Sequence, residues 1–147
     1  MIKKQLYDKC MELLNIQLEK YRNEIKMVKD ALESDSEQSD EADTGKNEML
    51  NEIEKYAKYL DTTENLKAQL KHVDISLSNT TVGSGSIVET ENNFFFIAVA
   101  LGKIDIDDSK NYYSISTEAP IYKMLKDKKA GDNFSFNNMT YRILNVF

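Results

Sequence analysis

Apolar residues recur with a helical period through the first part of the chain. From Tyr7 to Leu32 they lie alternately four and three residues apart, a heptad pattern sustained for nearly four repeats. Neither Gly nor Pro interrupts residues 1 to 44, and helix-favouring Glu, Lys, Leu and Met are frequent before residue 33. The pattern predicts one long helix with its apolar seam at Tyr7, Met11, Leu14, Leu18, Tyr21, Ile25, Val28 and Leu32.

A second segment repeats this pattern less regularly. Its seam positions stay apolar as far as Leu60, but Thr63 and Lys67 take the next two. A shift of the seam, or contact with another part of the chain, would account for the change. We expect a second helix whose start is capped by Asp43 or Thr44. Its apolar seam residues are Met49, Ile53, Tyr56 and Leu60, followed by Leu70.

Antiparallel pairing of the two helices gives the chain reversal a definite place. If Leu32 faces Met49, Tyr21 faces Leu60, and the register is centred between residues 40 and 41. At about 1.5 Å per residue, an arm of roughly 26 residues reaches on the order of 40 Å. The sequence therefore predicts a long helical rod with its tip near residue 40.

The helical period ends at Asp74, and β-type residues follow. Asn92 and Asn93 separate two strand-like segments, 86–91 and 94–101, as in a β-hairpin. The second segment is nearly all apolar, so we expect a central strand covered on both faces. Further strands are expected at 103–107, 111–116, 134–136 and 140–147, with turns at Asp107–Ser109 and Asn137–Asn138.

A short helix is expected within this second half, with Thr117 as its N-cap and Pro120 in its first turn. The predicted fold class is α+β. Residues 1–74 form a long N-terminal antiparallel α-helical coiled-coil hairpin, and residues 75–147 form a small domain in which a twisted antiparallel sheet carries one helix. The apolar face of that helix would be Ile121, Met124 and Leu125.

The net charge of -6 is concentrated in one stretch, residues 33–45. The chain has 25 acidic and 19 basic residues, and removal of the six acids in this stretch leaves 19 of each. A disordered acidic loop is one interpretation. The other is that the rod carries carboxylates to a place that a globular body cannot enter, since the stretch lies at the predicted tip. The six are Glu33, Asp35, Glu37, Asp40, Glu41 and Asp43.

Composition narrows the classes of function. With a pI near 4.9 and no basic block, the chain is not expected to bind duplex DNA directly. No apolar run approaches the ~20 residues of a membrane span, so no membrane association is expected. The lone Cys10 lies off the helix seam on an exposed or half-exposed face, and fits a reducing cytoplasm. The lone His72 favours a structural role, and we expect no enzyme activity of the chain's own.

A motif in the second domain resembles a known family. Residues 115–132 are similar to a stretch of type I-S-x-x-S-P-[IL]-x-x-x-L-[IL]-G-K-x-x-G-D, found in the bacterial Gre transcript-cleavage and elongation factors. Ala119, Lys126 and Asp127 depart from it, standing where the family has Ser, an aliphatic residue and Gly. With the helical layout before it, the resemblance covers essentially the whole chain. The matching residues are Ile115, Ser116, Pro120, Ile121, Leu125, Lys128, Gly131 and Asp132.

The resemblance implies both a fold and a partner. The second domain would be FKBP-like and would dock on RNA polymerase near the rim of its secondary channel, while the coiled coil enters the channel. The polymerase-binding residues would be Glu118, Ala119, Pro120 and Ile121. A monomer is expected rather than a dimer.

The family's acidic pair lies in a motif of type G-D-[LI]-x-E-N-A-E-Y. Alignment of residues 42–48 places Asp43 on the first acid and Lys46 on the second. Asp40, Glu41 or Glu48 could supply the missing carboxylate. The resemblance implies that the tip, through Asp40, Glu41 and Asp43, assists the polymerase's own nuclease by helping to hold a second Mg²⁺. The chain alone is expected to bind no cofactor.

Two alternatives accompany this interpretation. The substitution by Lys46 favours a channel binder of the Gre fold that inhibits or competes with other factors and does not stimulate cleavage. A coiled-coil dimerisation protein unconnected to transcription would explain the heptads but not the charge at the tip.

Overall fold

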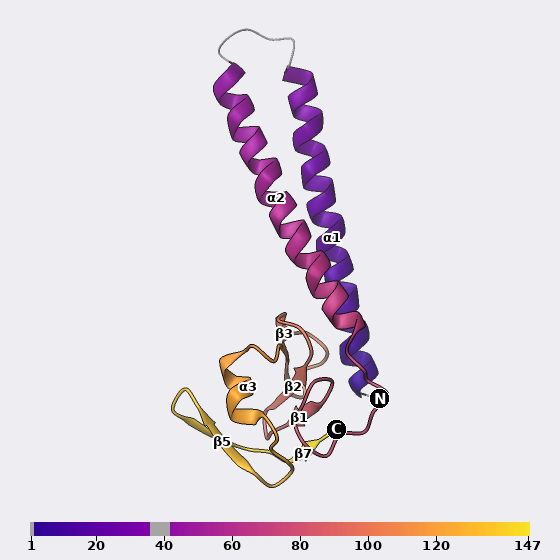
Figure 1. The fold of residues 1–147 in the computed structure, drawn as a ribbon, viewed down its shortest axis with the longest axis vertical. Coiled ribbons are helices and arrows are strands. Elements are labelled where there is room, and N and C mark those ends of the chain that lie inside the picture. Colours follow the sequence, from indigo (N-terminus) through magenta and orange to yellow (C-terminus); the bar gives the residue numbers. More distant parts are fainter. Residues whose placement is uncertain (1, 36–41) are drawn as a thin grey trace. The chain divides into compact units, whose positions relative to one another are not determined.

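The computed structural model describes residues 2–35 and 42–147. Helices α1 (Ile2–Asp35) and α2 (Ala42–Lys71) form a long hairpin, and a small β-sheet domain with one short helix, α3 (Pro120–Leu125), follows it (Figure 1). This architecture confirms the predicted fold class. Among the described helices, none is long and apolar enough to cross a membrane.

The chain divides into two compact units. One comprises Leu13–Lys67, and the other comprises Met1–Glu12 with Ala68–Phe147. The base of the helical hairpin thus belongs with the β strands. The predicted division at residue 74 separates the helices from the strands. The compact units differ from it, because the base of each long helix is grouped with the strands.

In the first unit aromatic side chains join the two helices. The Tyr21 ring lies 5.5 Å from the ring of Tyr59, the neighbour of its predicted partner Leu60, and 6.2 Å from the ring of Tyr56. Thr63, a polar residue at a seam position, is buried, and its hydroxyl donates to the Tyr59 carbonyl at 2.8 Å. Because this hydroxyl is hydrogen-bonded, a polar side chain can be buried at this seam position.

The predicted cap of α2 is wrong. The helix already begins at Ala42, so Asp43 and Thr44 lie inside it.

In the second unit the base of α1 buries a different face from the predicted seam. Leu6 and Cys10 are 0% exposed, whereas Tyr7 and Met11 are half-buried. The prediction that Cys10 lies on an exposed or half-exposed face is wrong, because this part of α1 packs with the β strands, where Cys10 hydrogen-bonds with Ser114. The heptad pattern reveals only the contact between the helices, not the second face.

Five strands form the main sheet, in the order β3-β4-β2-β1-β7. β1 (Ile87–Glu89) and β2 (Asn93–Ile97) form the predicted antiparallel hairpin, with Ile87 opposite Phe96. β2 lies in the centre of the sheet, and its last three residues are buried. The prediction of a central, covered strand is confirmed.

The prediction of an all-antiparallel sheet is wrong, because β4 (Asn111–Ile115) pairs with β2 in parallel. A parallel pair requires a crossover. The crossover includes β3 (Gly102–Ile104). After β2 the chain forms β3 at the edge of the sheet, and β4 then takes the position between β3 and β2.

The predicted strand 140–147 is divided between two sheets. β6 (Met139–Arg142) pairs with β5 (Asn133–Phe136) in a separate two-stranded sheet, and β7 (Asn145–Val146) pairs with β1. The break falls at Ile143, which is fully buried. Its N–H still donates to the Asp132 carbonyl, but the Leu144 N–H donates to the carbonyl of Glu89, the last residue of β1. Burial of Ile143 therefore redirects the chain from one sheet to the other.

Two turns depend on positive φ angles. Asn137 and Asn138 have φ of 51° and 64°, as a type I′ hairpin turn requires, which confirms the predicted turn between β5 and β6. Asp127, which stands where the Gre motif has Gly, has φ of 63°. Left-handed backbone costs an ordinary L-residue about 1–2 kcal/mol, so the conformation at this position favours glycine.

The core of the β domain contains side chains from both sheets, α3 and the connecting segments. Its buried members are Val82, Val88, Phe95, Ile97, Tyr122, Leu125, Phe134 and Ile143.

Candidate partner-binding surfaces

The acidic stretch spans the ends of both long helices. α1 ends at Asp35 and α2 begins at Ala42, so the predicted tip near residue 40 lies outside the described residues. Two of the three predicted tip residues, Asp40 and Glu41, lie outside the described residues. Asp43 belongs to α2, but its side chain lies outside them too.

The predicted Mg²⁺ site at Asp40, Glu41 and Asp43 therefore stays a prediction. In the part of the chain that the structure describes, no three His, Cys, Asp or Glu side chains come together to hold a metal ion. The donor chemistry of the tip fits Mg²⁺, because carboxylate oxygens are hard ligands.

The segment before α3 is a tight turn built on Ser116. Its carbonyl accepts the Ala119 N–H at 3.1 Å, and its hydroxyl accepts the Glu118 N–H at 3.2 Å. Ala119 is the N-cap and makes no side-chain cap bond, so the predicted cap on Thr117 is wrong. Pro120 at the first helical position fixes the start instead, since its φ is already helical.

The predicted polymerase-binding residues do not all face outward. Glu118 and Pro120 are exposed, whereas Ala119 and Ile121 are half-buried and pack against the core. The four residues are consecutive in one turn, but only Glu118 and Pro120 expose their side chains to solvent.

Helix α3 adds residues that sequence reasoning did not assign to this surface. Met124 was predicted to face the core, but it is 47% exposed, and Tyr122 lies in the core with Leu125. Tyr122 and Leu125 are three residues apart, so they share one face of the helix. That spacing could have predicted the buried face from the sequence. We call Glu118, Pro120, Lys123 and Met124 the α3 surface.

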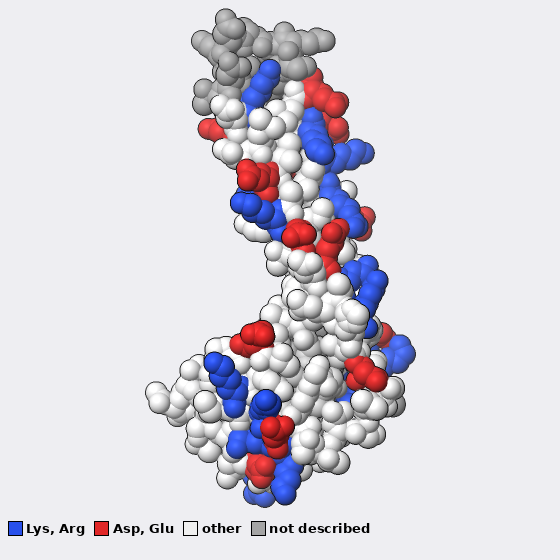
Figure 2. All heavy atoms as spheres, in the orientation of Figure 1, with Lys and Arg blue, Asp and Glu red and all other residues white. Residues whose placement is uncertain are grey.

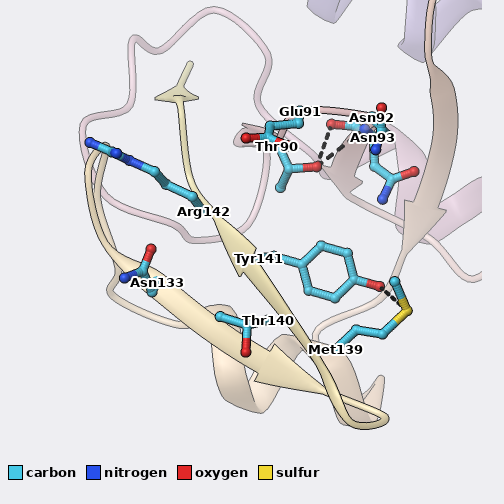
Figure 3. A pocket seen from close by; sticks show the side chains of 9 residues that line it. All are labelled: Thr90, Glu91, Asn92, Asn93, Asn133, Met139, Thr140, Tyr141 and Arg142. Carbon is cyan, nitrogen blue, oxygen red and sulfur yellow. Dashed lines mark hydrogen bonds between the residues drawn. The ribbon is translucent and has the colours of Figure 1, made fainter.

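A pocket of about 250 Å³ lies between the β1–β2 turn and the β5–β6 hairpin (Figure 3). Tyr141 is the one aromatic residue in its lining, and its hydroxyl contacts the Met139 sulfur at 3.7 Å. Thr90 closes the turn by hydrogen-bonding with Asn93. The lining offers hydrogen-bonding groups, but not the nucleophile with adjacent base that covalent catalysis uses. The residues are Thr90, Glu91, Asn92, Asn93, Asn133, Met139, Thr140, Tyr141 and Arg142.

Two titratable groups are buried at the base of α1. Lys3 donates to the Leu77 carbonyl at 2.7 Å and to Asn79 Oδ1 at 3.0 Å, and burial lowers its pKa, opposed by the charge of Asp74. Burial raises the pKa of the Cys10 thiol from 9.0 to about 11, opposed by its hydrogen bond with Ser114.

The thiol should make stability depend on pH. In the unfolded chain it ionises near pH 9, whereas in the folded chain it keeps its proton up to about pH 11. Ionisation in that range favours the unfolded state, so the free energy of unfolding should fall by up to about 1.4 kcal/mol per pH unit. Urea unfolding of the wild type and of Cys10→Ala across this range checks it. The variant should show a shallower fall, and equal slopes would contradict the assignment.

No protein-family profile matches the sequence, and no curated protein is similar enough to count as a relative. Among solved structures, the chain is similar to a transcription factor, Gfh1, with 20% identity and a TM-score of 0.34, covering 95% of this chain and 92% of that one. It is also similar to Gfh1 of Thermus aquaticus, with 19% identity and a TM-score of 0.35, covering 92% of each chain. These values are too low to carry a function to this chain.

Proposed function

We propose that the chain is an RNA polymerase-binding regulator of transcription elongation that inserts its acidic tip into the polymerase's secondary channel. The observation that carries the proposal is the placement of charge. In the sequence, the six carboxylates that account for the whole net charge fall within residues 33–45, the stretch in which α1 (Ile2–Asp35) ends and α2 (Ala42–Lys71) begins. A rod that served only for dimerisation would not need them there.

The chemistry of the tip suits a role in transcript cleavage. Two Mg²⁺ ions roughly 3.5–4 Å apart would hold the attacking water and the leaving oxygen in line. Carboxylates at Asp40, Glu41 and Asp43 would add oxygen ligands at the polymerase's site and orient the water. The remaining acids would attract cations and steer the tip through a basic channel.

The α3 surface is the proposed docking site. Pro120 and Met124 offer exposed apolar contacts held rigidly by Tyr122 and Leu125 in the core. A rigid surface binds at lower entropic cost, because little side-chain ordering is needed.

Binding to core RNA polymerase tests the proposal. Replacing both Pro120 and Met124 with Ala should weaken binding about tenfold or more, since interface anchors each contribute on the order of 1 kcal/mol or more. Met139→Ala is the matched control, because Met139 is 59% exposed on β6, outside the α3 surface. No binding of the wild type to polymerase would refute the proposal.

Lys46 supports a second candidate function. It stands where the family's second acid belongs, and it lies in α2, half-buried near the helix start, where a cation opposes the helix dipole. A channel binder that does not stimulate cleavage would slow nucleotide addition by polymerase and leave backtracked transcripts at their original length.

A further inference from the structure

A hollow of about 410 Å³ lies next to the α3 surface, between α3, the loop that follows it and β5. Three lysines line it, Lys123, Lys126 and Lys128, together with Met124 and residues 133–135. We call it the lysine hollow. It shares Lys123 and Met124 with the α3 surface, so one partner could contact both.

No ion pair within the described residues neutralises the lysines of the hollow. None of the lining residues is acidic, and the three lysines make no ion pair with any described side chain. Two acids occur in the same loop: Asp127 is exposed, and the Asp132 carboxylate accepts the Lys129 N–H at 3.0 Å. Figure 2 shows blue side chains over α3 and the following loop, with red among them. Neither acid lines the hollow.

The walls of the hollow are preorganised. The backbone of Lys128 is held at both ends, its carbonyl accepting the Val82 N–H at 2.8 Å and its N–H donating to Leu125 at 3.1 Å. Phe134 is buried and stacks on Tyr141, with ring centroids 4.9 Å apart. The lysines thus extend from a fixed frame, which favours binding of a complementary charge.

We propose that the lysine hollow binds an acidic segment of a partner protein, with carboxylates at Lys123, Lys126 and Lys128 and an apolar side chain against Met124. The proposal extends the proposed function, since on that function the partner is RNA polymerase. The lysine hollow would add charged contacts to the apolar contacts that Pro120 and Met124 of the α3 surface would make.

Single-stranded RNA is the other anionic partner to consider, and the hollow suits it less well. Such sites combine a basic groove with exposed aromatic rings on which bases stack. The one aromatic ring here, Phe134, is only 4% exposed.

The test has a peptide arm that does not depend on polymerase. A labelled peptide of alternating Glu and Leu, its Gln-for-Glu counterpart and an oligouridine RNA are titrated with the wild type at low salt. The hollow variant, Lys126→Glu with Lys128→Glu, reverses the charge of two of the three lysines. The α1 variant, Lys26→Glu with Lys29→Glu, makes the same charge change at two exposed positions on α1. The acidic peptide should bind the wild type and the α1 variant alike, and bind the hollow variant about tenfold or more weakly.

Three results would overturn the inference. They are equal binding of the acidic and Gln peptides, unchanged peptide binding by the hollow variant, and tighter binding of RNA than of peptide. A polymerase arm separates this inference from the proposed function. If the wild type binds polymerase and the hollow variant binds it equally well, the inference fails and the function stands. If peptide binding behaves as expected but polymerase is not bound, the function fails and the hollow stands.

Discussion

Neutralising Asp40, Glu41 and Asp43 together, as D40N, E41Q and D43N, is expected to reduce stimulated transcript cleavage by about a hundredfold. The amides keep the size of the side chains but remove the charge and the strong oxygen ligands for Mg²⁺, and lesser disturbances around a metal already cost about 10–100-fold. Binding to polymerase should change only a few-fold, because the α3 surface is intact. The rate of transcript shortening in a backtracked elongation complex measures stimulated cleavage. A binding titration measures the affinity for polymerase.

A control variant separates the position of the charge from its amount. Glu19→Gln, Glu52→Gln and Asp61→Asn remove the same charge from exposed positions along α1 and α2. This variant should stimulate cleavage as the wild type does. Equal loss in both variants would mean that overall charge matters and the tip does not. If the wild type leaves transcripts uncut while binding polymerase, the non-cleaving channel binder is the correct function.

Replacing Phe96 with Ala is expected to lower the free energy of unfolding by about 3–5 kcal/mol, the range for a buried aromatic residue. Phe96 is 0% exposed in the central strand, between Ile87 on β1 and Ser114 on β4. The loss combines the free energy of transferring the ring from the core to water with the cost of the cavity that remains. Urea unfolding followed by circular dichroism measures it.

The exposed Met139, changed to Ala, serves as the comparison and should cost well under about 1 kcal/mol. A Phe96→Ala loss no larger than the Met139→Ala loss would show that β2 is not the centre of the folded domain.

Local patterns predicted those parts of the fold that local physics decides. The heptads between Tyr7 and Leu32 required a helix pair, and paired asparagines at Asn92–Asn93 and Asn137–Asn138 marked the two hairpins. The apolar run around Phe96 required burial on both faces, which only a central strand provides.

The errors concern contacts between distant segments. The parallel pairing of β2 with β4 depends on where the chain crosses over, and no local pattern records that choice. The burial of Cys10 depends on strands about a hundred residues later in the sequence. At the α3 surface, the proline motif located α3 correctly, but which residues face outward depended on whether Tyr122 or Met124 entered the core.

The delivery of the tip into polymerase can be measured directly with a cysteine placed at the tip. Ser39→Cys introduces a reactive thiol in the acidic stretch, while Cys10 is fully buried and its raised pKa, about 11, keeps it protonated and unreactive near neutral pH. An iron chelate attached to the new thiol generates hydroxyl radicals that cut nearby polypeptide. In complex with RNA polymerase, we predict cuts in the segments surrounding the polymerase's catalytic Mg²⁺. Cuts confined to the outer surface of the polymerase, or none at all, would contradict the proposed function.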